Sequence, residues 1–183
     1  GTSYEVTTYR VEQGYSDRRH PDAVIFVPDL YEDLRRRDFT VNAIAMDRRG
    51  TFQDPFDGRG DIQRKLLRCV GEPDRRLRED GLRVMRGLRF AASLSYLVEE
   101  ETAAALHRNR GMLKHVAAER IRAELCKLLT GVGAAAILRD YPDVLLEFWP
   151  ELGPLMELEQ HNPWHCWGGW EHTIHAVEEA HAD

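Results

Sequence analysis

The spacing of apolar residues changes near Asp74, from short strand-like segments to a helical period, and this change limits the possible folds. Before it, residues 4–11 mix Val, Thr and Tyr in near alternation, a pattern typical of a strand. Residues 43–46 and 51–52 flank the turn 47–50 and predict a hairpin. Because so few strands would leave open sheet edges, we expect the chain to begin inside a domain.

Helical periodicity dominates the rest of the chain. In residues 79–94, apolar side chains gather on one face of a helical wheel and arginines on the other, with Asp80 at the margin of the basic face. Further helices are predicted at residues 99–107, 117–129, 133–141 and 170–182. The predicted fold class is therefore α+β and mostly α, with a partial strand-containing head followed by helices.

Charge is distributed unevenly along the sequence. The 183 residues carry a formal net charge of −6, yet residues 140–183 contain ten acidic residues and no Lys or Arg. The preceding part is therefore net basic, which suggests one region that faces a polyanion. The simpler alternative is a solvated charged surface without a partner.

Composition also bears on the location of the protein in the cell. No stretch approaches the ~18 apolar residues of a membrane span, so we expect no membrane association. The three cysteines are far apart and match neither a disulfide framework nor a zinc ribbon. A reducing cytoplasm is therefore the expected location.

The first cluster of chemically informative residues is a run of arginines at positions 35–37, followed by Asp38 and Asn42. Adjacent guanidinium groups can bind phosphates through planar, permanently charged donors. The carboxylate and the amide could hydrogen-bond a ribose hydroxyl. The alternative is a basic turn before a helix.

The second cluster lies in the amphipathic segment. Asp80 and Arg83 are one helical turn apart, so together they could offer a carboxylate and a guanidinium to the edge of a nucleobase. Arg86 and Arg89 would extend the positive face along the helix. The alternative is an ordinary surface ion pair between Asp80 and Arg83.

The third cluster is rich in histidine and tryptophan and spans residues 161–175. Histidines three positions apart on a helix could bind a metal ion, with His172 as one candidate ligand. Packing and helix capping are the alternative explanation.

Taken in order, these segments resemble the class II tRNA nucleotidyltransferases, or CCA-adding enzymes, and the bacterial poly(A) polymerases. Residues 36–43 (RRDFTVNA) resemble motif B of this family, and residues 54–62 (DPFDGRGDI) resemble motif C. Residues 79–90 resemble motif D, and residues 119–129 resemble motif E. Residues 161–173 are similar to the start of an HD domain that many bacterial members carry.

The resemblance implies a polymerase-β-like nucleotidyltransferase head followed by an all-helical neck and body. We expect a head remnant at residues 1–58, a nucleotide- and RNA-binding neck at 59–130, and a body with the start of the HD domain at 131–183. The reaction would be attack of an RNA 3′ hydroxyl on the α-phosphate of CTP or ATP, assisted by Mg²⁺.

Residue roles also follow from the resemblance. Asp80 and Arg83 would pair with the incoming base in place of a nucleic-acid template, while Arg37 would contact the triphosphate. The remaining expected nucleotide-binding residues are Asp38, Asn42, Arg86 and Arg89. The other expected roles are RNA binding by Arg75, Arg76 and Arg120, a catalytic carboxylate at Glu5 and a metal ligand at His172.

One departure from the family pattern bears on activity. Motif A of the family holds its metal ions with an Asp-x-Asp strand, and no Asp-x-Asp occurs in these 183 residues. We therefore expect that this chain alone adds no nucleotides. The alternative functions are a poly(A) polymerase of the same family, a non-catalytic RNA-binding module, and a metal-dependent HD phosphohydrolase.

Overall fold

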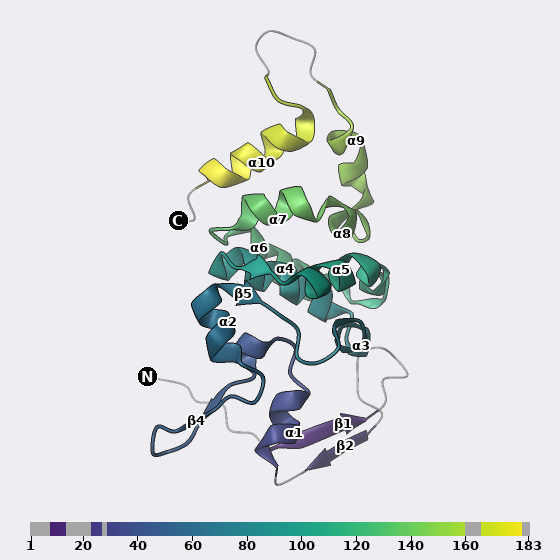
Figure 1. The fold of residues 1–183 in the computed structure, drawn as a ribbon. Coiled ribbons are helices and arrows are strands. Elements are labelled where there is room, and N and C mark those ends of the chain that lie inside the picture. Colours follow the sequence, from purple (N-terminus) through teal and green to yellow (C-terminus); the bar gives the residue numbers. More distant parts are fainter. Residues whose placement is uncertain (1–7, 14–22, 27–28, 160–165, 181–183) are drawn as a thin grey trace, which may run out of the picture.

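The computed structural model describes residues 8–13, 23–26, 29–159 and 166–180, and it stacks short elements along one axis (Figure 1). At one end lie β1 (Arg10–Gln13), β2 (Ala23–Phe26) and α1 (Leu30–Arg35). Longer helices fill the middle, and α10 (Gly169–Glu179) lies at the other end. This arrangement confirms the predicted fold class, a small strand-containing head followed by helices.

The strands among the described residues form three separate two-stranded sheets. Strands β1 and β2 pair in antiparallel register, as do β3 (Ala45–Met46) and β4 (Phe52–Gln53), whereas β5 (Leu66–Leu67) and β6 (Leu97–Val98) pair in parallel. The β3–β4 hairpin confirms the prediction from residues 43–52. Its turn is closed by Asp47 Oδ1, which accepts the backbone N–H groups of Arg49 and Thr51 at 2.8 and 2.9 Å. The predicted strand at residues 4–11 lies partly outside the described residues.

The described helices follow one another with short connections. They are α2 (Gly58–Arg64), α3 (Pro73–Glu79), α4 (Leu82–Leu94), α5 (Glu100–Arg108), α6 (Ala118–Leu129), α7 (Ala134–Asp140), α8 (Pro142–Leu146) and α9 (Gly153–Met156), with 3₁₀ turns η1 (Thr40–Asn42), η2 (Arg110–His115) and η3 (Pro150–Leu152). The predicted helices at 99–107, 117–129, 133–141 and 170–182 correspond to α5, α6, α7 and α10. The prediction of a single helix at 79–94 is wrong at its start. Helix α3 ends at Glu79, and a separate helix, α4, begins at Leu82.

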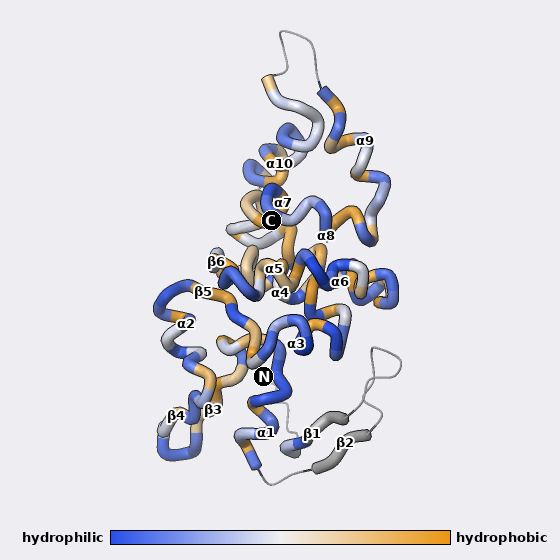
Figure 2. The backbone as a smooth tube through the Cα atoms, turned by 45° about the vertical axis from the view of Figure 1, so that its right-hand side comes forward, coloured by the Kyte–Doolittle hydropathy of each residue, from blue (hydrophilic) through white to orange (hydrophobic). Residues whose placement is uncertain are grey.

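The main hydrophobic core surrounds α4, which packs against both α6 and α7. Met85, Leu88 and Ala92 of α4 are fully buried there. Hydrophobic segments gather around α4 and α5, whereas the β3–β4 hairpin and α3 are largely hydrophilic (Figure 2). A second, much smaller cluster around Leu34, Ala43 and Val70 supports the head. Most of the burial that stabilises the fold is therefore helical.

None of the described helices is long and apolar enough to cross a bilayer.

Candidate functional site

A pocket of about 480 Å³ opens between the segment 36–42 and helix α4. Its lining residues are Arg36, Arg37, Asp38, Asn42, Asp80, Arg83, Arg86, Arg89 and Phe90. They include all seven residues to which the sequence analysis assigns nucleotide binding. The structure thus brings the first and second polar clusters of the sequence together on one surface.

Phe39 fixes the segment that carries Asp38. Its side chain is fully buried, and its backbone forms an antiparallel bridge with Cys69. The Phe39 ring meets Phe90 edge-on, with 5.8 Å between ring centroids. Gly87 of α4 permits this approach, because a Cβ atom there would lie 3.1 Å from the Phe39 ring. With Phe39 in the core, its neighbour Asp38 lines the pocket.

Asp38 is buried and paired with Arg86 of α4. The Arg86 Nε atom donates to Asp38 Oδ2 at 2.7 Å, while Oδ1 accepts the Asn42 side-chain amide at 3.1 Å and the Phe39 N–H at 2.9 Å. Burial by itself would raise the pKa of Asp38, but the Arg86 charge and these hydrogen bonds outweigh it and hold the pKa below its ordinary value. Asp38 is therefore an ionised acceptor at neutral pH.

The corner between α3 and α4 places Asp80 at the pocket. The Asp80 backbone is extended, with φ −146° and ψ 113°, so it ends α3 instead of continuing into α4. Gly81 is required at this corner because a Cβ atom there would lie 2.8 Å from the Met112 carbonyl oxygen. Asp80 Oδ1 accepts the Leu82 N–H at 3.0 Å and so caps the start of α4.

Asp80 and Arg83 each have a different charged partner. Asp80 Oδ2 lies 3.2 Å from Arg120 Nη2 of α6, whereas Arg83 Nη1 lies 2.6 Å from Glu79 Oε2. The sequence alternative, an ion pair between Asp80 and Arg83 themselves, is thus not what the structure shows. The pocket wall offers both an acceptor carboxylate and a donor guanidinium.

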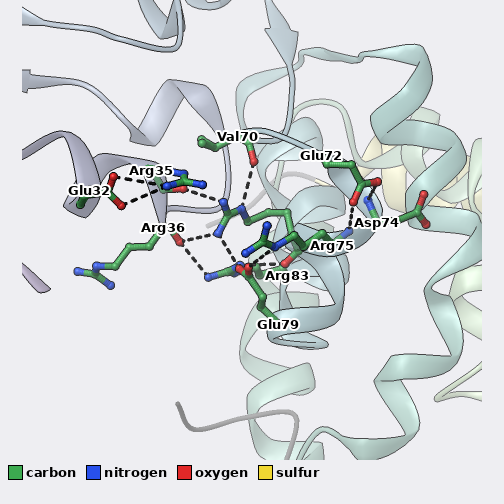
Figure 3. A network of polar contacts seen from close by, with 10 residues as sticks. Glu32, Arg35, Arg36, Val70, Glu72, Asp74, Arg75, Glu79 and Arg83 are labelled. Carbon is green, nitrogen blue, oxygen red and sulfur yellow. Dashed lines mark hydrogen bonds and ion pairs between the residues drawn. The ribbon is translucent and has the colours of Figure 1, made fainter. Parts of the chain in front are cut away.

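Backbone carbonyl groups also hold Arg83 in place (Figure 3). Its Nη1 atom donates to the carbonyl oxygen of Arg76 at 2.8 Å, and its Nη2 atom donates to that of Arg36 at 3.1 Å. Only 11% of the Arg83 side chain is exposed. The Arg83 guanidinium is therefore held by one carboxylate and two carbonyls before any ligand arrives.

Arg76, expected to bind RNA, makes its contacts inside the protein. Its guanidinium donates to Glu79 at 2.6 Å and to the carbonyl oxygens of Arg35, Arg36 and Val70 at 2.7, 3.2 and 3.1 Å. Burial lowers the pKa of Arg76 from its usual value, although the Glu79 charge opposes this change. Arg76 thereby joins α3 to the C-terminal end of α1, where helix carbonyls are unpaired within the helix.

Arg89 and Arg37 lie at other parts of the pocket lining. Arg89 Nε donates to Glu124 Oε2 of α6 at 2.9 Å, and the Arg89 guanidinium lies 3.4 Å from the centroid of the Phe90 ring. Arg37 is more open, with 44% of its side chain exposed, and its Nη1 atom donates to the Asn42 carbonyl oxygen at 3.1 Å. Arg37 is therefore the more accessible of these two cations.

Arg75 and Arg120, both expected to bind RNA, lie outside the pocket lining. The Arg75 side chain is 75% exposed, with 3.8 Å between its Nε atom and Glu79 Oε1. Arg120 is outside the pocket lining and reaches the pocket only through Asp80. Glu5, predicted as a catalytic carboxylate, lies outside the described residues.

The described residues do not supply a metal site. They contain no group of three or more His, Cys, Asp or Glu side chains that could hold a metal ion. His172 lies on α10 with an exposed side chain and joins no such group in the described part of the chain. The Mg²⁺ that the resemblance implies therefore finds no ligand set here.

Sequence reasoning assigned no site role to Glu79, Glu124 or Phe90. Glu79 carried a usable signal, because it precedes Arg83 by one helical turn and such pairs attract each other. Glu124 lies within the segment that resembles motif E, but its contact with Arg89 depends on how α4 packs against α6. Phe90 follows Arg89 directly on α4, and its ring contacts the Arg89 guanidinium within the pocket lining.

Comparison with known proteins agrees with this geometry. The Poly A polymerase head domain family matches residues 1–68, and the family described as "Probable RNA and SrmB-binding site of polymerase A" matches residues 96–143. The CCA-adding enzyme of Lactobacillus delbrueckii subsp. bulgaricus is 48% identical over 141 residues, which cover 77% of this chain and 36% of that enzyme.

Two solved structures share the fold. The CCA-adding enzyme of Bacillus stearothermophilus in complex with CTP has a TM-score of 0.69 and 45% identity, over 80% of this chain and 34% of that one. The CCA-adding enzyme of Thermotoga maritima complexed with tRNA has a TM-score of 0.60 and 26% identity, over 73% of this chain and 32% of that one. This chain spans about a third of the length of these relatives. It belongs to the family of CCA-adding enzymes and poly(A) polymerases.

Proposed function

We propose that the pocket binds the incoming CTP or ATP of a tRNA nucleotidyltransferase, which adds CMP and AMP to the 3′ end of tRNA. The observation that carries this proposal is the placement of Asp80 and Arg83 in one pocket without an ion pair between them. Arg120 holds Asp80, and Glu79 holds Arg83. The CTP complex of the Bacillus stearothermophilus relative supports the choice of ligand.

Hydrogen-bond polarity explains why this pair would select C and A. Both bases present an amino donor beside a ring-nitrogen acceptor, whereas U and G present a carbonyl beside a ring N–H. An ionised Asp80 only accepts and Arg83 only donates, so the pair is complementary to C and A alone. A wrong base would leave partly buried donors and acceptors unpaired, at a cost of about 1–3 kcal/mol for each group.

The rest of the nucleotide would lie along the opposite wall. Asp38 and Asn42 face the pocket beside each other and are suited to ribose hydroxyl groups. Arg37, the more open cation, would contact the triphosphate, with Arg86 and Arg89 adding positive charge. The pocket thus has separate groups for the base, the sugar and the phosphates.

RNA would approach from outside this pocket. Arg75 has an exposed guanidinium that can reach a phosphate, whereas the donors of Arg76 are used within the protein. We place the head at residues 1–58, the nucleotide- and RNA-binding neck at 59–130 and the helical body at 131–183. The tRNA complex of the Thermotoga maritima relative supports tRNA as the partner.

The transfer step needs groups that the described residues do not provide. Phosphoryl transfer depends on positioning and on neutralising charge, for which a divalent ion such as Mg²⁺ is the usual agent. The 183 residues contain no Asp-x-Asp pair, so we propose that this chain binds nucleotide without transferring it. Its free cysteines among the described residues fit a reducing cytoplasm, which is the location we propose.

Calorimetric titration of the chain with CTP, ATP, UTP and GTP tests the proposal. We expect CTP and ATP to bind at least about tenfold more tightly than UTP and GTP. The free-energy cost of leaving one donor or acceptor unpaired corresponds to an affinity ratio of about that size. Arg83→Ala should bring the four affinities together while preserving most of the phosphate-dependent binding. Equal affinity for all four nucleotides in the unaltered chain would contradict base selection.

The same titration separates the alternatives. A poly(A) polymerase would prefer ATP to CTP, although both bases match the Asp80–Arg83 pair. A binding module that recognises charge alone would lose affinity for all nucleotides equally in Arg83→Ala. The affinity of that variant would also depend less steeply on salt than the affinity of the unaltered chain.

A further inference from the structure

Two donors from two different helices hold the Asp80 carboxylate. The Leu82 N–H at the start of α4 donates to Oδ1 at 3.0 Å, and Arg120 Nη2 of α6 donates to Oδ2 at 3.2 Å. Each oxygen thus has one donor on the protein side and retains a further lone-pair direction for a ligand. Two separate donors fix the rotation of the carboxylate about its side-chain bonds, which a single donor would not do.

Arg120 itself is held by a rigid support. Helices α4 and α6 pack closely, with Ile121 and Leu128 of α6 buried in the main core. A second charged contact joins the same helices, between Arg89 and Glu124 at 2.9 Å. The Arg120 side chain therefore starts from a position that is fixed relative to the pocket, although it is not part of the pocket lining.

We propose that Arg120 is a positioning residue that determines base specificity by orienting the Asp80 carboxylate. This inference rests on the proposed function, in which Asp80 accepts the amino group of C or A. With Arg120 in place, the carboxylate stays directed at the base edge. The carbonyl oxygen of U or G would then face a fixed carboxylate oxygen, and two acceptors cannot form a hydrogen bond. Without Arg120, Asp80 rotates, and this rejection is lost.

The proposal differs from direct RNA binding by Arg120, which the sequence suggested. Direct contact with an RNA phosphate would make Arg120 important for RNA affinity and irrelevant for the choice between free nucleotides. A purely structural role in joining α4 to α6 would change stability and would alter all nucleotide affinities alike. Only positioning of Asp80 changes the ratio between CTP and UTP.

Nucleotide titration of the chain and its variants provides the test. Arg120→Met keeps the apolar stem and the helix propensity but removes the donor, and Arg120→Lys keeps a charge at the same place. We expect the CTP-to-UTP affinity ratio to fall from at least about tenfold to within about threefold in Arg120→Met, and to recover in Arg120→Lys. Arg122→Met is the matched control, because Arg122 lies on the same helix in a separate groove with Val116 and Leu125.

A double-mutant cycle makes the result independent of any loss of stability. In an Asp80→Ala background, Arg120→Met should leave the CTP-to-UTP ratio unchanged, because Arg120 acts on the base only through Asp80. A ratio that stays intact in Arg120→Met, or that falls equally in the Asp80→Ala background, overturns the proposal. No preference for CTP in the unaltered chain would instead refute the proposed function, and this inference with it.

Discussion

Arg86 and Asp38 form an ion pair at the pocket although 48 positions separate them, with 2.7 Å between Arg86 Nε and Asp38 Oδ2. We expect Arg86→Met to lower the free energy of unfolding by about 2 kcal/mol, between the values of exposed and fully buried pairs. The reason is that a buried carboxylate loses its charge partner. CTP affinity should fall as well, because Asp38 and the positive wall are both disturbed. Urea unfolding and calorimetric titration measure the two effects.

The exposed Arg48 in the β3–β4 turn supplies the control for this prediction. Arg48→Met should change the free energy of unfolding by less than about 0.5 kcal/mol, as surface substitutions usually do. The double variant Asp38→Asn with Arg86→Met should lose less stability than the sum of the single changes. Full additivity would show that the two side chains do not act as a pair.

Arg76 joins α3 to the C-terminal end of α1, so its replacement should loosen this connection. Arg76→Ala leaves Glu79 without one cation and leaves the carbonyl oxygens of Arg35, Arg36 and Val70 without a donor. We expect a loss of about 3 kcal/mol in the free energy of unfolding, typical of breaking one partner of a buried pair. Amide hydrogen exchange should increase in α1, since its C-terminal carbonyls are no longer held.

Two further variants serve as controls for Arg76→Ala. Arg76→Lys keeps the charge but offers a point contact in place of a planar fork, so it should restore less than half of the lost stability. Arg75→Ala, at the exposed neighbouring position, should leave stability almost unchanged. Equal effects at positions 75 and 76 would refute the joining role.

The longer helices were predictable because each buries one regular face. Their periodicity alone located α5, α6, α7 and α10 within a few residues. Helices α1, α2 and α3 were missed because six or seven residues are too short to show a period. The start of α4 was misplaced because the wheel pattern continues through Asp80, whereas the close approach of Gly81 to Met112 is a tertiary effect.

The residues that line the candidate site were predictable from the sequence, but the hydrogen bonds and ion pairs that hold them were not. The sequence motifs assigned nucleotide binding to seven of the nine lining residues, from Arg37 to Arg89. They did not show that Arg76 is buried or that Arg120 holds Asp80. Those contacts depend on how α3 and α6 pack against the head and against α4, which no local pattern encodes.

Acid should weaken the fold through Asp61, a fully buried carboxylate that accepts a hydrogen bond from Thr40. Burial by itself would raise its pKa, but hydrogen bonds from Thr40, Arg64 and Arg68 outweigh this and hold the pKa below its usual value. A carboxyl with a lowered folded-state pKa stabilises the fold above its unfolded pKa of about 3.9. We therefore expect constant stability between pH 7 and about pH 5, and progressive loss below about pH 4.

Urea unfolding at a series of pH values checks this expectation. Asp61→Asn should be less stable than the unaltered chain at pH 7, because an amide pairs poorly with two guanidinium groups. The difference between the two proteins should shrink as the pH falls, since protonation removes the same charge from Asp61. A difference that grows toward low pH would contradict the assigned direction of the pKa shift.

Gly58, the first residue of α2, determines how closely that helix approaches η1. A Cβ atom at Gly58 would overlap the carbonyl oxygen of Thr40 and would lie 2.9 Å from the Ile44 side chain. Because backbone cannot yield as a side-chain end can, we expect Gly58→Ala to cost about 3 kcal/mol or more. Displacement of η1 should also move Asn42 and so weaken CTP binding.

Gly111, in the 3₁₀ turn η2, provides the matched substitution. A Cβ atom at Gly111 would meet no heavy atom within 4 Å, so Gly111→Ala should be neutral or slightly stabilising through the unfolded chain. Thermal unfolding of both variants decides the matter, since only Gly58→Ala should unfold at a clearly lower temperature. Similar melting temperatures for the two variants would mean that α2 can move away from Thr40 at little cost, and the position of η1 would then not depend on this contact.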